Sequence, residues 1–111
     1  MAITTSDYKR CSLVKMTGRI DSATGDSLLQ TFQKLQDEGK YKLVFDMEEV
    51  EFMSSKGWWV LIETQKASKR YNRGELVLAN VPDKILSSLD LVGMSHYFKI
   101  FDDVVSAVGN F

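Results

Sequence analysis

The sequence predicts an α/β fold built around a mostly parallel sheet. Short runs rich in β-branched and aromatic residues are typical of strands, and the central ones cover residues 12–18, 41–46 and 75–80. Longer runs have apolar residues at helical spacing, and they cover residues 24–38, 55–71 and 83–91. Strands that alternate with helices are typical of parallel strands joined by crossover helices. The carboxyl ends of such strands carry the functional loops.

The first half of the chain provides two strands, a helix and a further strand. Residues 12–18 alternate between the two faces of a strand that ends at Gly18, and residues 3–9 predict a weak edge strand before it. Ser22 or Thr24 is the expected N-cap of the first helix, which ends at Gly39. The acidic stretch at residues 48–51 follows the strand at 41–46, and we interpret it as a solvent-exposed loop.

The second half repeats the alternation. Asn72-Arg73-Gly74 ends the helix that begins at residue 55, and Pro82 starts a short helix that Gly93 closes. A last strand is expected at residues 97–101 and a last short helix at residues 102–110. We see no internal repeat and no linker, so residues 1–111 are expected to form a single domain.

Composition argues against several classes of protein. The 14 basic and 15 acidic residues give a net charge of −1, so a basic nucleic-acid-binding surface is not expected. No apolar run approaches the roughly 20 residues that cross a bilayer, and the start of the chain does not resemble a signal peptide. Cys11 is the only cysteine, which favours a reducing, cytoplasmic setting.

Residue types that would support catalysis are scarce. His96 is the only histidine, and neither it nor Cys11 lies within a recognisable catalytic motif. We find no metal-ligand motif and no glycine-rich phosphate-binding motif. The sequence therefore predicts a protein that is not an enzyme, with no catalytic residue, metal or cofactor.

Two hydroxyls and two tryptophans lie where the second helix begins, in the stretch EFMSSKGWWVLI at residues 51–62. Trp58 is in phase with the apolar positions of the helix, so it is expected in the core. Trp59 points about 100° away, and it either forms part of a protein interface or packs against a neighbouring helix. If the strands at 12–18 and 41–46 are neighbours, Asp21 and Ser55 lie close together.

The chain resembles the STAS domain family, in particular the bacterial anti-sigma factor antagonists. Three stretches carry the resemblance over roughly residues 10–108, namely LVKMTGRIDSAT, LVFDMEEVEFMSSKGWWVLI and GELVLANVPDKILSSLDLVGMSHYFKIFDDVVSAV. It implies a STAS-like mixed, mostly parallel sheet of four to five strands with about four helices. It also implies a regulatory protein that binds an anti-sigma factor, which is also a serine kinase, and so releases a sigma factor.

The family motif Asp-Ser-Ser-Gly-Leu falls on residues 54–58. The resemblance implies phosphorylation of Ser55, with Ser54 as the alternative, and it places Asp21 at the turn after the first long strand. The partner-binding residues that we expect are Asp21, Ser54, Ser55, Lys56 and Trp59.

Ser54 stands where the family has Asp, and Lys56 stands where it has the second Ser. Some STAS proteins are not phosphorylated and act as scaffolds, sensors or components of transport systems, which is the alternative function. We predict that Ser55 both caps the second helix and acts as the switch, and that the protein is a monomer or a weak dimer.

Overall fold

The computed structural model describes residues 2–91 and 96–111. The elements in these ranges follow the order ββαββαβαβα, with a short 3-10 turn, η1, after the second helix. Their bounds are β1 Ala2–Asp7, β2 Ser12–Ile20, α1 Ser22–Asp37, β3 Lys42–Asp46, β4 Val50–Met53, α2 Ser55–Lys69, η1 Arg70–Asn72, β5 Glu75–Ala79, α3 Asp83–Leu91, β6 Ile100–Phe101 and α4 Val104–Gly109.

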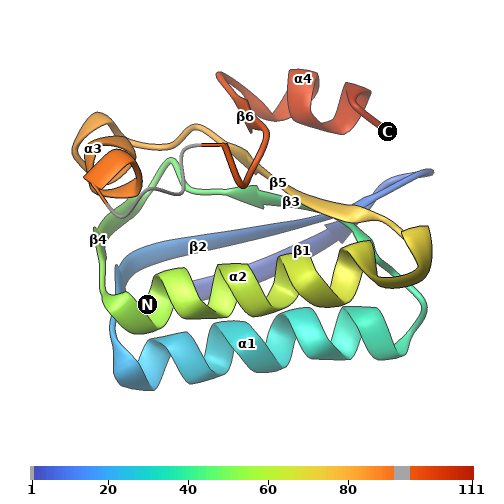
Figure 1. Cartoon of the computed structure of the whole chain (residues 1–111), viewed down its shortest axis with the longest axis horizontal. Helices are drawn as coiled ribbons and strands as arrows, with labels where there is room; N and C mark the ends of the chain where they lie inside the picture. Colours follow the sequence, from blue (N-terminus) through green and yellow to red (C-terminus); the bar gives the residue numbers. More distant parts are fainter. Residues whose placement is uncertain (1, 92–95) are drawn as a thin grey trace.

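The strands form one mixed sheet in the order β1-β2-β3-β5-β6, and β4 also pairs with β2 (Figure 1). Among the strand pairings of the described residues, β1–β2 alone is antiparallel and the others are parallel. Val14, Phe45 and Leu78 lie in register across β2, β3 and β5, and all three are fully buried. The α/β class and the mostly parallel sheet that the sequence predicts are confirmed.

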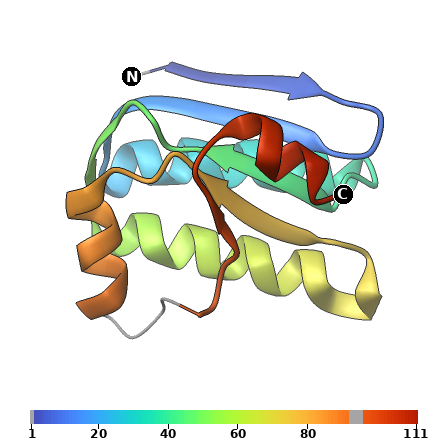
Figure 2. The ribbon, with the colours of Figure 1, turned by 90° about the horizontal axis from the view of Figure 1, so that it is seen from above.

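Helices cover the sheet on both faces. Helices α1 and α2 run side by side along one face, and α4 lies on the other (Figures 1 and 2). The main core lies under α1 and α2, where Phe32 of α1 meets Phe45 edge to face at 5.6 Å between ring centroids. Val44 and Val77 point the opposite way and form a smaller cluster with Ala107 of α4. This alternation follows the period of two that a strand imposes.

The α1–α2 layer also contains a buried polar contact. Gln36 of α1 donates from Nε2 to the Thr64 carbonyl at 3.1 Å and to Ser68 Oγ at 3.0 Å. These bonds join the carboxyl-terminal halves of α1 and α2, which lie side by side. No helix among the described residues is long and apolar enough to cross a membrane.

The structure corrects the predicted strands in two places. Residues 50–53 form β4, and only residues 48–49 form a turn, so the expected loop at 48–51 is wrong in its second half. Val50 is 3% exposed and pairs with Gly18, which provides the reason for a strand here. The last strand spans two residues and not residues 97–101. Gly93, expected to close α3, lies outside the described residues.

Candidate partner-binding surface

Helices α1 and α2 begin next to one another. Ile20 at the end of β2 pairs with Met53 at the end of β4. The Ser54 N–H then donates to the Ile20 carbonyl at 2.9 Å. Because Asp21 follows Ile20 directly, Asp21 and Ser54 lie at adjacent helix starts, at the carboxyl end of the sheet. The sequence predicts that Asp21 and Ser55 lie close together; the structure brings Asp21 and Ser54 to adjacent helix starts, and Ser55 follows as the first residue of α2.

Ser54, and not Ser55, caps α2. Ser54 has extended backbone angles, and its Oγ accepts the Gly57 N–H at 3.3 Å. Ser55 is the first residue of the helix, and its side chain is exposed. Within the described part of the chain, the Ser55 hydroxyl forms no hydrogen bond. The predicted cap at Ser55 is therefore wrong by one residue, and the exposed Ser55 side chain takes no part in capping α2.

Asp21 caps α1, in place of the expected Ser22 or Thr24. Its carboxylate accepts the backbone N–H groups of Ala23 and Thr24, and the Thr24 hydroxyl accepts the Asp21 N–H at 2.9 Å. This reciprocal arrangement is a capping box. The backbone hydrogen bond from Thr24, followed by the bond from its hydroxyl, lowers the pKa of Asp21. Asp21 is consequently a fixed negative charge beside the start of α2.

Lys56 connects the two helices. Its Nζ lies 2.9 Å from Asp26 Oδ1 on α1 and 4.6 Å from the centroid of the Trp59 ring. Its stem packs against Gly25, where an added Cβ would lie 2.8 Å from Lys56 Cγ. These contacts hold the Lys56 ammonium between α1 and Trp59.

Gly57 allows α2 to approach the sheet closely. A Cβ added at Gly57 would lie 2.6 Å from Met53 Sδ and 2.9 Å from Ile20 Cγ2. Any side chain would therefore have to displace Met53, Ile20 or the helix itself. The glycine in the motif thus serves to seat the first turn of α2, and with it Ser55, directly on the ends of β2 and β4.

The two tryptophans have the environments that their helical phase predicts. Trp58 is 7% exposed and belongs to the core, whereas Trp59 is 45% exposed. Trp59 follows Ser55 by four residues, so both side chains lie on the same face of α2. We refer to Asp21, Ser54, Ser55, Lys56 and Trp59 as the helix-start surface.

Sequence reasoning missed an exposed aromatic side chain close to this surface. Phe52 on β4 is 39% exposed, and the Arg19 guanidinium lies 4.2 Å from its ring centroid. Val50 and Phe52 are two residues apart, so a strict strand period would place both side chains on one face of the sheet. Val50 is buried and Phe52 exposed, and the β2–β4 register shifts between their partners Gly18 and Arg19. No alternating pattern in the sequence therefore marked β4 or this aromatic position. The acidic residues around them led instead to the interpretation as a loop.

Comparisons with known proteins agree with this architecture. An anti-sigma factor antagonist from Mycobacterium paratuberculosis is 22% identical, with a TM-score of 0.87, and the match covers 98% of this chain and 92% of the other. The phosphorylated form of the Bacillus cell fate determinant SpoIIAA is 13% identical, with a TM-score of 0.78 and 98% of each chain covered. A sulfate transporter family protein from Wolinella succinogenes is 19% identical, with a TM-score of 0.73, and covers 88% of this chain and 81% of its own.

At these identities the structural likeness establishes the fold. The family follows from the sequence itself, because the model of the STAS domain matches residues 2–107. This match spans every strand and nearly all of the helical residues described above. The chain belongs to the STAS domain family.

Proposed function

We propose that this protein is a non-catalytic cytoplasmic regulator that binds an anti-sigma factor with serine kinase activity and so releases a sigma factor. The observation that carries the proposal is the exposed Ser55 hydroxyl at the first residue of α2, on the same helix face as exposed Trp59. Exposed aromatic side chains are enriched at protein interfaces. A serine kinase could reach Ser55 without unfolding any element.

Phosphorylation of Ser55 would switch this surface. A phosphate adds about −1.5 to −2 charges at neutral pH. The start of α2 can accept these charges, because free N–H groups and the helix dipole favour an anion there and Lys56 lies next in sequence. A partner fitted to the neutral hydroxyl would instead have to bury a dianion next to the Asp21 carboxylate. The domain would keep its fold and lose its partner.

The capping geometry favours Ser55 over Ser54 as the modified residue. The Ser54 side chain is used by the Gly57 N–H, whereas the Ser55 hydroxyl has no competing bond among the described residues. Ser54 also replaces the aspartate of the family motif without losing the helix cap, since Ser and Asp are both good N-caps. The presence of Ser54 in place of aspartate removes one negative charge beside Ser55. It changes the surface that a kinase would recognise, whereas the start of α2 keeps its cap.

The proposal is tested by placing a negative charge at position 55 and measuring the affinity for anti-sigma factors. Anti-sigma factors encoded in the same genome are purified, and their affinities for the wild-type chain and for Ser55→Asp and Ser55→Ala are measured by calorimetry. We expect Ser55→Asp to weaken binding at least tenfold and Ser55→Ala to retain it. Ser106→Asp is the matched control, because it adds the same charge to the first turn of α4 on the opposite face of the sheet.

Phosphorylation gives an independent measurement. Incubation with the bound kinase and ATP should add one phosphate, which tandem mass spectrometry should map to Ser55. A phosphate on Ser54 would shift the proposed site by one residue. The absence of any phosphate, together with equal affinities for Ser55→Asp and Ser55→Ala, would contradict the switch.

An alternative function is a STAS module that is not phosphorylated and that serves a transport system, a scaffold or a sensor. The likeness to the sulfate transporter family protein and the missing motif aspartate support it. Gene neighbours separate the two functions, since an adjacent ATP-binding anti-sigma kinase favours the first. Capture of a transport component, with no effect of Ser55→Asp on that capture, would favour the alternative.

A further inference from the structure

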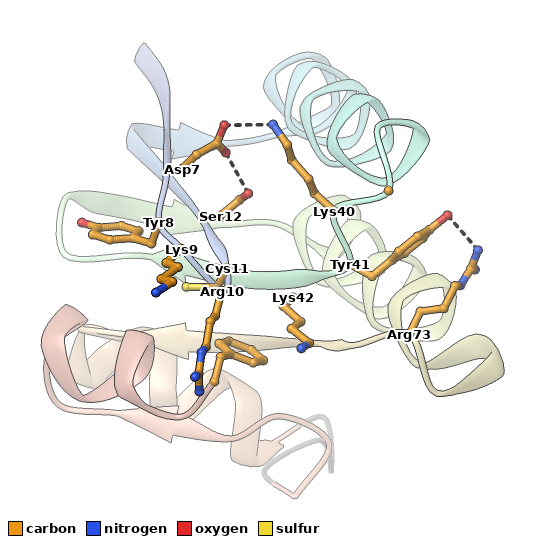
Figure 3. Close-up of a pocket in the computed structure, with 12 residues that line it drawn as sticks. Asp7, Tyr8, Lys9, Arg10, Cys11, Ser12, Lys40, Tyr41, Lys42 and Arg73 are labelled. Atoms are coloured by element: carbon orange, nitrogen blue, oxygen red, sulfur yellow. Dashed lines mark hydrogen bonds and ion pairs between the residues drawn. The ribbon is translucent and has the colours of Figure 1, made fainter.

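A basic pocket lies at the end of the sheet opposite to the helix-start surface. It is formed by the β1–β2 turn, the segment that leads into β3 and the segment that leads into β5, and its volume is about 660 Å³ (Figure 3). Five cationic side chains line it, and Asp7 is its only carboxylate side chain. The charged side chains of the lining sum to four positive charges, and Phe111, the last residue of the sequence, adds a carboxylate to the same lining; the side chains of the whole sequence sum to −1. The five cations are Lys9, Arg10, Lys40, Lys42 and Arg73.

Two of the five cations are used within the protein. Lys40 Nζ lies 2.9 Å from Asp7 Oδ2 and 3.1 Å from Glu38 Oε1. The hydrogen bonds to Asp7 and Glu38 raise the pKa of Lys40, and the bond from Lys40 lowers the pKa of Asp7. Arg73 stacks 3.8 Å from the centroid of the Tyr41 ring and donates to the Tyr41 hydroxyl. These contacts build the walls of the pocket.

The other three cations have no such partner. Lys9, Arg10 and Lys42 make no ion pair and no hydrogen bond with any side chain that the structure describes. Lys42 lies in register with Glu75, but Glu75 is already paired with Lys99, whose Nζ lies 3.2 Å from Glu75 Oε1. The lining therefore carries three positive charges that have no side-chain counter-ion among the described residues, and a bound anion would neutralise them.

The walls of the pocket are rigid enough to hold these charges in place. A Cβ added at Gly74 would collide with the Tyr41 carbonyl oxygen, so the two segments touch backbone to backbone. The Tyr8 N–H donates to the Cys11 carbonyl at 2.8 Å, which closes the β1–β2 turn that carries Lys9 and Arg10. The Ser12 hydroxyl donates to Asp7 Oδ1 across the same turn.

We propose that this pocket binds a small molecule that carries two or more phosphate groups. Three unpaired cations match the charge of such a ligand, and both Arg and Lys are common phosphate ligands. The volume of the pocket lies within the range of small-molecule sites. A concave site accommodates a compact anion better than it accommodates a flat membrane surface. The pocket is at the amino ends of β2 and β3, so the proposal does not depend on the function of Ser55.

Calorimetry with sodium tripolyphosphate, in about 0.1 M salt, tests the site in the intact chain. We expect saturable binding that weakens as salt is added, with amide chemical-shift changes confined to residues 7–12 and 39–42. The double variant Arg10→Ala/Lys42→Ala should weaken binding at least tenfold. The control Lys66→Ala/Lys84→Ala removes the same charge from α2 and α3, outside the pocket, and should change the affinity less than twofold.

Three results would overturn the proposal. They are the absence of tripolyphosphate binding, an equal loss in the two double variants, and binding to phosphatidylglycerol vesicles without any binding of tripolyphosphate. Melting curves of both double variants establish that they are folded, since the altered side chains lie at the surface. Ser55→Asp should bind tripolyphosphate as the wild type does, which separates this site from the proposed phosphorylation switch.

Discussion

Replacement of Gln65 by methionine should destabilise the domain more than any other change of a polar side chain to one of similar length. Gln65 lies on α2 and is fully buried. Its Oε1 accepts the Leu76 N–H at 2.7 Å, and its Nε2 donates to the carbonyls of Leu76 at 3.0 Å and Tyr97 at 3.3 Å. The short strand β6 pairs with β5 only at Leu78 and Ala79. β6 does not reach Leu76, so the Gln65 side chain makes the backbone hydrogen bonds that a longer neighbouring strand would make there.

The magnitude follows from the groups left behind. Methionine keeps the length of the side chain but cannot pair with the Leu76 N–H and C=O, which would remain buried. Each unsatisfied buried group costs about 1–3 kcal/mol, so the expected loss is about 2–6 kcal/mol. With a urea dependence of about 1–3 kcal/mol per molar, a loss of about 3 kcal/mol lowers the unfolding midpoint by about 1–3 M.

Urea unfolding followed by tryptophan fluorescence is a suitable assay, because Trp58 and Trp59 lie on the same helix as Gln65. Gln33→Met is the matched control, since Gln33 is exposed on α1 and its replacement should change stability by less than about 0.5 kcal/mol. A loss below about 1 kcal/mol for Gln65→Met would refute the reasoning, because it would mean that water or a local shift satisfies Leu76 at little cost.

Further predictions concern the helix-start surface. Trp58→Ala should cost about 3–5 kcal/mol in urea unfolding and Trp59→Ala less than about 1 kcal/mol, and equal losses would contradict their assignment to core and surface. Ser54→Ala should lower stability by about 1 kcal/mol and Ser55→Ala by much less, and the reverse order would return the cap to Ser55. The pKa of Asp21 is lower in the folded protein than its ordinary value of 3.8, so the Asp21 carboxylate stabilises the fold at pH values above 3.8. This contribution is lost as the pH falls below that value and through the lowered pKa. Asp21→Asn keeps the cap, so its melting temperature should fall less steeply below about pH 4, and an unchanged slope would count against the assignment.

Local patterns in the sequence were enough for the elements with strong periodicity. The helices near 24–38, 55–71 and 83–91 and the three central strands lie within a few residues of the predicted bounds. Trp58 and Trp59 separate into core and surface as a 100° rotation per residue requires. These features depend on contacts between residues that are close in sequence, and such contacts leave a readable period.

The errors have a common origin in contacts that the local pattern does not contain. Phe52 and its neighbours form β4 because the last residues of β2 extend beyond the end of β3 and pair with this segment instead. The acidic residues next to Phe52 led to the prediction of a loop. Ser54 takes the cap of α2 because its N–H is held by the Ile20 carbonyl, which fixes the backbone one residue before Ser55. From the sequence, either serine of the pair could cap α2. The hydrogen bond from the Ser54 N–H to the Ile20 carbonyl on β2 decides that Ser54 is the cap.

The sequence by itself determined the class of fold, the phase of each helix and the serine pair at which α2 begins, because each of these follows from residue order along a single element. The tertiary structure alone decided that Asp21 and Ser54 begin adjacent helices and that Gln65 completes the edge of β5. It also decided that Lys9, Arg10 and Lys42 share one pocket although they come from the separate segments 9–10 and 42. The physical reason is that sheet register and backbone hydrogen bonds between distant segments place these groups, and neither is encoded in the period of any one segment.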